Sequence, residues 1–527
     1  MDGRCKIALF ENKKKPLELN ELAEDKKTKR LKEKPLKILI AASEAVPFAK
    51  TGGLADVAGA LPIALKKLGH DVRIVIPRYS CIDIEKFGIK NSEKQIRVNI
   101  ALFDHFGVIM ESVLPGTDIP AYFIENTEFF HREGLYGTEQ DEYWDNAERF
   151  IFFSRAVVEM LRVIDFRPDV IHCSDWHTGL IPVYLRTTYA WDKNAYGTMA
   201  TVYSIHNMAY QGVFDRGKLS HAGLPDSLFN VNEMEFYGGV SFMKGGIVFS
   251  DIINTVSQRY KEETKTPEFG CGLDGLLASR GDDYYGVLNG IDYSIWNPAT
   301  DALLPANYTP DDLTGKTEVK KAMLEEFGLK YIENVPVIGL VSRLDGQKGL
   351  DFIASIIEDM MRMNLQFVVL GTGEERYHEM LSHFKGRYPE KLGLMLKFDN
   401  RLAHMIYAGC DMFVMPSHFE PCGLGQLISL KYGTVPLVRE TGGLADTVRQ
   451  YNFKTKQGNG FVFGGFNPYD LLHAIVIAAD TYKNKTVWNR IMMNGMKMDF
   501  SWQQAAAEYT AIYRRAVDKA YERQNLI

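Results

Sequence analysis

Short apolar runs alternate with longer amphipathic stretches along most of this chain. Lys37–Ala42 is short enough for a buried parallel strand, and Val72–Ile76 is a second run of the same kind. Between them, apolar residues recur at helical spacing on one face, at Leu54, Val57, Leu61, Leu65 and Leu68. This order of strand, helix and strand predicts a parallel βαβ unit.

The same alternation recurs in the rest of the chain. Four later apolar runs end in polar or glycine-rich residues and precede helical stretches: Asp169–Cys173, Met199–Ile205, Val335–Val341 and Gln366–Leu370. We therefore predict an α/β fold built from doubly wound parallel sheets. Ligands bind beyond the carboxyl ends of the strands in such sheets, so the residues that directly follow each run are the first candidates for chemistry.

Length and composition are typical of a large globular enzyme with two packed domains. The chain has 527 residues, of which 46% are hydrophobic and 24% charged, and its net charge is −6. This mildly acidic balance gives no electrostatic reason to expect a nucleic-acid partner. No apolar run approaches the length of a membrane span, and the N-terminus lacks the apolar core of a signal peptide, so no membrane association is predicted.

The cysteines and the N-terminal residues give evidence about the cellular compartment of the protein. The six cysteines are scattered without a C-x-x-C pair, which argues against a zinc site or a disulfide framework and favours a reducing cytoplasm. Residues 1–36 mix lysines with glutamates and aspartates. Because organellar transit peptides are poor in acidic residues, we predict a solvated, charged extension there instead.

A six-residue string, T-G-G-L-A-D, occurs twice, at Thr51–Asp56 and at Thr441–Asp446. Glycine has no Cβ, so backbone N–H groups in such a loop can approach an anion closely, and the positive end of a following helix adds to the attraction. A tight turn without a ligand is the alternative for a single Gly-Gly. The repetition favours two anion-binding loops, with a phosphate-bearing ligand held between two domains.

Polar residues also follow the later strands. Asp175 lies in D-W-H, His206 begins H-N-M-A-Y-Q-G, and Arg343 and Lys348 lie in S-R-L-D-G-Q-K-G. Arginine can hold a diphosphate with a bidentate fork, and lysine can add a point charge. The alternatives are a solvated helix start for the two cations and a buried, hydrogen-bonded imidazole for His206.

Seven motifs follow one another along the chain: K-T-G-G-L-A-D-V, D-W-H, H-N-x-A-Y-Q-G, L-N-G-I-D, S-R-L-x-x-Q-K-G, F-E-P-C-G-L and M-K-M-D-F-S-W. From about Lys37 to the C-terminus, this set resembles the glycogen and starch synthase family. The resemblance implies the GT-B architecture, in which two Rossmann-like, doubly wound domains face a central cleft. It also implies transfer of glucose, with retention of configuration, from a nucleotide sugar to the non-reducing end of an α-1,4-glucan. ADP-glucose is the expected donor, UDP-glucose is the alternative, and glycogen or a related α-1,4-glucan is the acceptor.

By the same resemblance, the chain divides into four segments. Residues 1–36 are the charged extension, residues 37–288 a domain on the acceptor side, and residues 289–500 a domain that binds the nucleotide-sugar donor. Residues 501–527 are expected to form a helix that crosses back to the first domain. Closure of the two domains would complete the site.

The resemblance also implies roles for single residues. The expected catalytic residues are Glu420, Asp175, His206, Arg343 and Lys348, with Glu420 beside the transferred glucose and the two cations at the diphosphate. The expected substrate-binding residues are Lys50, Gly52, Gly53, Asp56, Asn207, Asn289, Phe398, Cys422, Gly423, Leu424, Gly442 and Gly443. Phe398 would stack on the nucleobase. Gly425 departs from the family, because many relatives carry a hydroxyl or a larger side chain at this position. The lack of a side chain at Gly425 can remove one hydrogen bond to phosphate.

No cofactor or metal is expected. The chain contains no Asp-x-Asp motif, so cationic side chains would stabilise the departing diphosphate. Retention can arise through a carboxylate nucleophile or through attack on the same face as the departing diphosphate, and the second is favoured because the family lacks an obvious nucleophile. Three other functions are ranked lower: a non-catalytic glucan or nucleotide-sugar binding protein, a dinucleotide oxidoreductase and an α-glucan phosphorylase.

Overall fold

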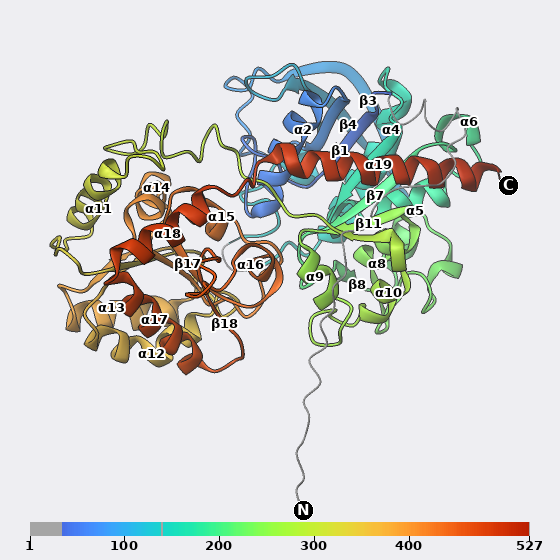
Figure 1. The fold of residues 1–527 in the computed structure, drawn as a ribbon. Coiled ribbons are helices and arrows are strands. Elements are labelled where there is room, and N and C mark those ends of the chain that lie inside the picture. The colour runs from blue at the N-terminus through green and yellow to red at the C-terminus, as the bar shows by residue number, and fades with distance from the viewer. Residues whose placement is uncertain (1–33, 139–140, 526–527) are drawn as a thin grey trace, which may run out of the picture. The chain divides into compact units, whose positions relative to one another are not determined.

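The computed structural model describes residues 34–138 and 141–525, so residues 1–33 of the expected charged extension lie outside the described residues. From Leu36 onward, the chain forms one compact unit. Two large sheets organise this unit, and we call the part of the chain around each sheet a lobe (Figure 1). The first lobe contains the strands between residues 37 and 286, and the second lobe contains those between residues 337 and 463.

Strand order in the first lobe is that of a doubly wound sheet. Within the described residues its nine strands lie in the order β12-β11-β7-β6-β1-β2-β5-β4-β3. They are β1 (Lys37–Ala41), β2 (Asp71–Pro77), β3 (Lys90–Ile100), β4 (Phe103–Val113), β5 (Pro120–Glu125), β6 (Val170–Ser174), β7 (Ala200–Ile205), β11 (Ile252–Thr255) and β12 (Tyr284–Gly286). Neighbouring strands are parallel, except in the β3–β4 and β4–β5 pairs. The predicted strands in this part of the chain are confirmed, each to within one residue at either end.

The chain changes direction across this sheet between β1 and β6. It leaves β1 toward β2 and β5, and later returns to β6 before it moves on to β7 and β11. The loops that follow β1 and β6 therefore diverge on either side of a crevice, which is where ligands bind in open α/β sheets. Glu44 follows β1, and Asp175 follows β6 directly.

The second lobe repeats this arrangement with parallel pairing throughout. Its six described strands lie in the order β15-β14-β13-β16-β17-β18. They are β13 (Val337–Val341), β14 (Gln366–Leu370), β15 (Leu392–Met395), β16 (Met412–Met415), β17 (Val435–Arg439) and β18 (Phe461–Phe463). The predicted runs at residues 335 and 366 are confirmed as β13 and β14. The chain changes direction between β13 and β16, so the segments that follow these strands, with Lys348 and Glu420, lie at the second crevice.

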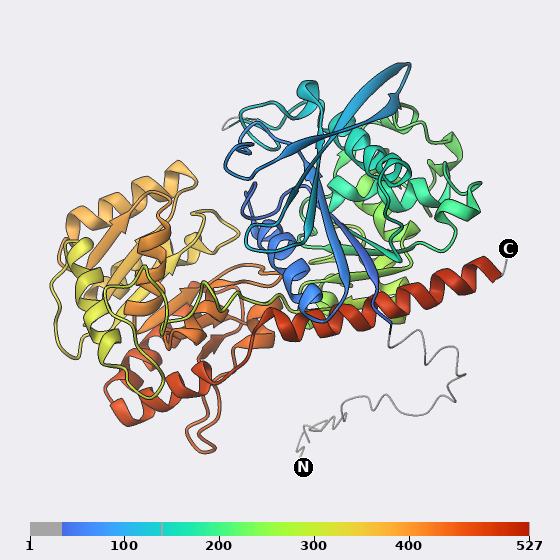
Figure 2. The same cartoon turned by 90° about the horizontal axis from the view of Figure 1, so that it is seen from above.

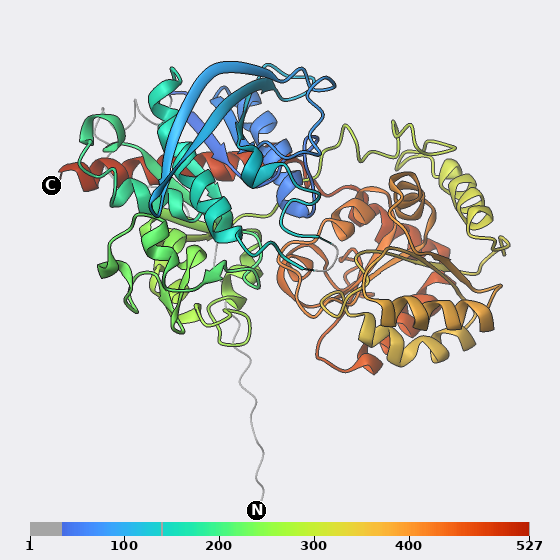
Figure 3. The same ribbon diagram turned by 180° about the vertical axis from the view of Figure 1, so that it is seen from behind.

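Helices connect the strands and cover the sheets, and Figure 3 shows those of the second lobe from behind. The described helices of the first lobe are α2 (Gly53–Lys67), α3 (Thr127–Phe130), α4 (Asn146–Val163), α5 (Leu180–Arg186), α6 (Lys193–Tyr196), α7 (Lys218–His221), α8 (Phe242–Phe249), α9 (Gln258–Glu263), α10 (Asp274–Ser279) and α19 (Trp502–Asn525). The other described α-helices are α11 (Thr314–Glu326), α12 (Leu350–Arg362), α13 (Glu375–Arg387), α14 (Asn400–Gly409), α15 (Gly425–Lys431), α16 (Gly442–Thr447), α17 (Pro468–Tyr482) and α18 (Lys485–Met496). A small antiparallel sheet, β8 (Val213–Phe214), β10 (Gly239–Ser241) and β9 (Glu235–Phe236), completes the described strands.

Two cores lie against opposite faces of the second sheet. Ile338 and Leu340 of β13 pack into one core with α12 and α17, whereas Val337 packs into the other with α11 and α14. This alternation follows from the two-residue period of a strand. It explains why the β13 sequence is continuously apolar, because both faces of the strand are covered.

Helix α2 follows the first glycine loop, with Gly52 at its N-cap. Four of the five apolar residues predicted on its inner face are buried, but the prediction for Leu68 is wrong. The helix ends at Lys67, and Leu68 at its C-cap is 46% exposed. Gly69 follows with φ +92°, a left-handed conformation that ends the helix and turns the chain toward β2.

The final helix, α19, follows α18 of the second lobe in sequence but packs on the first lobe, against α2 and β7 (Figure 2). Two buried tyrosines anchor it. The Tyr513 hydroxyl lies 2.8 Å from His172 Nδ1 in β6, and Asn254 Nδ2 in β11 donates a 3.2 Å hydrogen bond to the Tyr509 hydroxyl. None of the helices in the described ranges is long and apolar enough to cross a lipid bilayer.

Candidate active site

A cleft of about 660 Å³ lies where the two crevices meet, and residues of both lobes line it. Predicted site residues that line this cleft are Lys50, Gly52, Gly53, Asp56, Asp175, His206, Asn207, Asn289, Arg343, Lys348, Glu420, Cys422, Gly423 and Leu424. Among the described lining residues, Phe398, Gly442 and Gly443 do not appear. The structure therefore brings most of the predicted set together from segments that are far apart in sequence.

The first glycine loop holds a carboxylate of the chain itself. Glu44 accepts hydrogen bonds from the Thr51 N–H and, at 2.9 Å, from the Thr51 hydroxyl. Its burial raises its pKa, although the hydrogen bonds from Thr51 act in the opposite direction. Next to this loop, Lys50 Nζ lies 2.7 and 2.8 Å from the two carboxylate oxygens of Asp56, and its side chain is about half exposed to the cleft. Asp56 thus orients the ammonium group of Lys50.

The second glycine loop also holds a carboxylate, and this one comes from the other lobe. The Gly442 N–H lies 3.1 and 3.0 Å from the two oxygens of Glu263, and the Thr441 hydroxyl lies 3.4 and 3.3 Å from them. Both copies of T-G-G-L-A-D therefore bind a carboxyl group of the chain in this structure, and in each copy it belongs to a glutamate. Gly442 and Gly443 were expected to contact substrate, but they contact Glu263 and the backbone of residues 420–422 instead.

Asp175 has an unusual backbone conformation at the end of β6. Its φ and ψ are 55° and −178°, a combination that side chains rarely adopt and that is often found at functional sites. Its Oδ1 accepts a 2.7 Å hydrogen bond from the His206 N–H. Burial raises the pKa of Asp175 to about 7, while the N–H groups of His206 and Asn207 lower it. This hydrogen bond joins the D-W-H and H-N-M-A-Y-Q-G motifs.

The imidazole of His206 is neutral and has an unused polar atom. Burial lowers the pKa of His206 to about 4. Its Nε2 is buried, lacks a hydrogen-bond partner in the described part of the chain, and belongs to a residue that lines the cleft. A ring nitrogen of this kind can accept or donate one hydrogen bond. The alternative of a fully hydrogen-bonded core histidine does not describe this residue.

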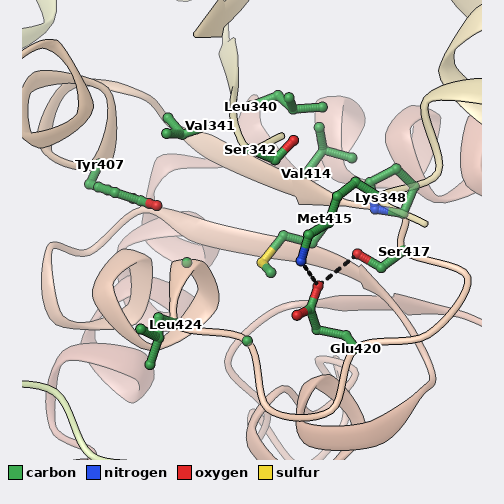
Figure 4. Close-up of a pocket in the computed structure, with 13 residues that line it drawn as sticks. Leu340, Val341, Ser342, Lys348, Tyr407, Val414, Met415, Ser417, Glu420 and Leu424 are labelled. Carbon is green, nitrogen blue, oxygen red and sulfur yellow. Dashed lines mark hydrogen bonds and ion pairs between the residues drawn. The ribbon is translucent and has the colours of Figure 1, made fainter. Parts of the chain in front are cut away.

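The second lobe contributes an ion pair. Lys348 Nζ lies 2.7 Å from Glu420 Oε2, and the Ser417 hydroxyl donates a 3.0 Å hydrogen bond to the same oxygen (Figure 4). The Glu420 side chain is only 7% exposed. Lys348 and Glu420 also line a smaller cavity of about 120 Å³ beside the cleft, in which Figure 4 shows Tyr407.

Arg343 is positioned differently from Lys348. Its guanidinium lies 3.1 Å from the Asp345 carboxylate, and its side chain is 57% exposed toward the cleft. The two cations therefore reach the cleft from opposite ends of one loop, which follows β13. The Arg343 side chain has room to turn toward a ligand, because it is not buried.

Neither Phe398 nor Gly425 is among the described residues that line the cleft. Phe398 lies between β15 and α14 with its side chain 86% exposed, and its stacking on the nucleobase stays a prediction. At Gly425, an added Cβ would lie 2.9 Å from the Phe413 ring, so this ring takes up the space that a larger residue would need. Within the described residues, no group of three or more His, Cys, Asp and Glu side chains is arranged to hold a metal ion.

Sequence reasoning missed several residues of the cleft. They include Glu44, Tyr136, Glu142, Asn146, Trp176, His177, Tyr210 and Gln347. Glu44 could have been found, because it follows β1 at the crevice in the same way that Asp175 follows β6. Trp176 and His177 belong to D-W-H itself, and their rings stack with centroids 4.0 Å apart. Tyr136 lies in the connection between α3 and α4, Asn146 is the first residue of α4, and neither belongs to a recognisable motif.

Comparison with known families divides the chain much as the two lobes do. Residues 37–279 match the starch synthase catalytic domain, and residues 325–487 match glycosyl transferases group 1. Glycogen synthase from Geotalea daltonii is 46% identical over 484 residues, which cover 92% of this chain and 99% of that protein. Glycogen synthase from Thermotoga maritima is 46% identical over 492 residues, with the same coverage of both chains.

Solved structures agree with these relatives. The catalytic domain of starch synthase IV from Arabidopsis thaliana, bound to ADP and acarbose, superposes with a TM-score of 0.85 and 34% identity, over 92% of this chain and 100% of that one. Sucrose-phosphate synthase from Thermosynechococcus elongatus superposes with a TM-score of 0.57 and 14% identity, over 90% and 98% of the two chains. The similarity to sucrose-phosphate synthase supports the fold alone. The predicted architecture of two doubly wound domains is confirmed.

Proposed function

The chain belongs to the glycogen and starch synthase family of glucosyltransferases, and from this premise we propose how its cleft carries out the reaction. Glucose passes from ADP-glucose to the non-reducing end of an α-1,4-glucan, with retention of configuration and without a metal ion. The observation that carries the proposal is the cleft itself, where Lys50 and Asp175 of one lobe meet Lys348 and Glu420 of the other.

The donor is assigned as ADP-glucose. A similar structure is described as bound to ADP and acarbose, which supports an adenine nucleotide on the donor side and a glucan on the acceptor side. UDP-glucose stays the alternative donor, because no residue of the cleft distinguishes the two bases. The base would lie in the second lobe, beyond Lys348.

The diphosphate of the donor binds between cations of both lobes in this proposal. Lys348 keeps its bond to Glu420 and uses its remaining N–H donors for phosphate oxygens, since an ammonium group has three. Arg343, which is exposed to the cleft, turns from Asp345 to add a bidentate contact. Lys50, oriented by Asp56, adds a third positive charge from the first lobe.

Transfer follows attack on the same face as the departing diphosphate. The bond between the anomeric carbon and the diphosphate oxygen breaks, and the acceptor hydroxyl forms the new bond and gives its proton to a diphosphate oxygen. The three cations stabilise the negative charge that develops on the leaving group. Glu420 stabilises positive charge at the anomeric carbon, and neutral His206 accepts a hydrogen bond from the sugar at Nε2. A two-step route through a carboxylate nucleophile is the alternative.

The segment boundaries and the location complete the proposal. Residues 37–288 would be the acceptor-side domain, residues 289–500 the donor domain, and residues 501–527 the helix that returns to the first domain. Cys81, Cys173, Cys271, Cys410 and Cys422 are free thiols, the form expected in the reducing cytoplasm that we infer for this protein.

The test is glucose incorporation into glycogen by the purified full chain, from ADP-glucose and from UDP-glucose in parallel, each with and without a chelator. We expect incorporation from ADP-glucose at a rate that the chelator does not change. Preference for UDP-glucose would overturn the donor assignment, and loss of activity in chelator would overturn the metal-free mechanism. No incorporation from either donor by folded protein would favour the binding-protein alternative.

A further inference from the structure

Helices α9 and α16 belong to different lobes and pack against each other in a reciprocal way. Glu263, the last residue of α9, accepts hydrogen bonds at the N-terminus of α16 from Thr441 and Gly442. Asp446 of α16 accepts a 2.9 Å hydrogen bond from the Arg259 N–H at the N-terminus of α9. Each helix therefore supplies a carboxylate to the positive end of the other, which stabilises both.

The Glu263 carboxylate is buried, and hydrogen-bond donors and a guanidinium group surround it. The residue is 8% exposed, and its Oε1 also lies 3.1 Å from Arg259 Nε. Burial of an unpaired carboxylate would be costly, so this set of partners is required if the residue is to remain in place. None of these groups lines the cleft in the described part of the chain, so the contact has no direct access to substrate.

The start of α16 is in close contact with the backbone of the loop that carries Glu420. The Gly443 N–H donates hydrogen bonds of 3.1 and 3.2 Å to the carbonyl oxygens of Glu420 and Pro421. A Cβ at Gly442 would lie 1.9 Å from the Glu420 carbonyl oxygen, and a Cβ at Gly443 would lie 2.1 Å from that of Cys422. The two glycines are therefore required for close approach of the helix to this loop.

A second bond ties the same loop to the first lobe. Ser257, the N-cap of α9, accepts from the Tyr260 N–H and donates a 2.7 Å hydrogen bond to the Pro421 carbonyl. Residues 420–422 are thus held from two sides, by Ser257 directly and by Glu263 through α16. The side chain of Glu420 projects from this loop to Lys348.

We propose that Glu263 and Asp446 are positioning residues that hold the Glu420 loop in its catalytic position by fixing α16 against the first lobe. The inference rests on the proposed role of Glu420. Removal of the Glu263 carboxylate frees the start of α16, and the Glu420 carboxylate then moves relative to the sugar held by the first lobe. Misplacement of this kind lowers kcat more than it changes KM, because the lost interaction is strongest in the transition state.

The test compares kcat and KM for the donor in Glu263→Ala, Glu263→Gln and Asp446→Asn. Glu262→Ala is the matched control, since Glu262 is the neighbouring, 62% exposed glutamate of the same helix. We expect kcat to fall at least tenfold in Glu263→Ala and at least threefold in Glu263→Gln, with KM within threefold and the control unchanged. Added formate should restore kcat of Glu263→Ala saturably, because a small carboxylate can fill the vacated place, and it should not affect the wild type.

Three outcomes would overturn the inference. They are kcat of folded Glu263→Gln within twofold of the wild type, an equal loss in Glu262→Ala, and no response of folded Glu263→Ala to formate. Glu420→Gln is measured in parallel to separate the two proposals. An active Glu420→Gln variant would overturn the proposed role of Glu420. If Glu420→Gln is inactive and the Glu263 variants are fully active, only the positioning role of Glu263 is overturned.

Discussion

Lys348 and Glu420 neutralise each other inside the second lobe, with nitrogen and oxygen 2.7 Å apart, and Lys50 and Asp56 do the same at the rim of the first. At the residue scale, charges of the cleft are therefore held by partners before a ligand binds, which reduces the reorganisation that catalysis would otherwise require. Asp175 and Glu44 differ, because they accept hydrogen bonds from uncharged groups. Asp175 faces backbone N–H groups and the nearby carboxylate of Glu44, and burial dominates its ionisation.

A pH prediction follows for Asp175. Its pKa of about 7 in the folded chain lies above the usual value of 3.8, so the fold favours the neutral acid. The stability that this group contributes is therefore present below about pH 4 and is lost as the pH rises through about 7. Asp175→Asn does not titrate, so its melting temperature should rise relative to the wild type between pH 5 and pH 8, by the equivalent of about 2–3 kcal/mol.

Thermal unfolding of both proteins across this pH range checks the prediction. Asp165→Asn, at an exposed position before β6, serves as the control and should follow the wild type. A difference between Asp175→Asn and the wild type that is the same at pH 5 and pH 8 would contradict the assignment of the raised pKa to Asp175.

At the element scale, the apolar pattern predicted β1, β2, β6, β7, β13 and β14, because strands that are buried on both faces read as continuous apolar runs. It did not predict β3 and β4, in which exposed and buried residues alternate. The glycine loops were recognised from the same kind of local reading, since a strand, a glycine turn and a helix follow one another within a few residues. Helix α19 is different. Its place on the first lobe depends on side chains such as Tyr513, whose partner His172 is in β6.

The contact between Tyr513 and His172 can be tested by removal of one hydroxyl. In Tyr513→Phe, His172 Nδ1 is left buried without its 2.8 Å partner, which should cost about 1–3 kcal/mol of stability. We expect a lower melting temperature with unchanged secondary structure by circular dichroism. Tyr521→Phe on the 40% exposed tyrosine of the same helix is the matched control and should leave the melting temperature within error. Equal effects of the two substitutions would show that His172 does not depend on Tyr513.

At the scale of the whole molecule, several contacts tie the two lobes beyond the continuity of the chain. They include the contact between α9 and α16, the hydrogen bond from Ser257 to the Pro421 carbonyl, and the 2.8 Å hydrogen bond from the Ile291 N–H to the Phe500 carbonyl, where the two connecting segments pair. The cleft is lined from both lobes, so a bound donor would add another link.

This arrangement predicts that ADP raises the melting temperature through both lobes. At a concentration of 100 times its Kd, a ligand of the folded state adds about 2.7 kcal/mol. Lys50→Ala in the first lobe and Lys348→Ala in the second should each reduce the shift produced by ADP in the presence of chelator, while the exposed Lys67→Ala of α2 should keep it. If ADP raises the melting temperature of Lys50→Ala as much as that of the wild type but does not raise that of Lys348→Ala, the second lobe alone holds the nucleotide.

The sequence alone was sufficient for the α/β class, for six of the eighteen described strands and for the residues that lie directly after those six, because these features depend on neighbours within a few positions. It was also sufficient for the family, through motifs such as D-W-H and F-E-P-C-G-L. The tertiary structure decided which groups meet. The second glycine loop was expected to bind substrate, and in this structure its Gly442 N–H binds Glu263, which lies 179 residues away in the chain. Asp175 lies 31 residues from the His206 N–H that it binds, and Asp446 lies 187 residues from its partner at Arg259. Such contacts depend on how sheets and lobes pack, and no local period of hydrophobic and polar residues records that packing.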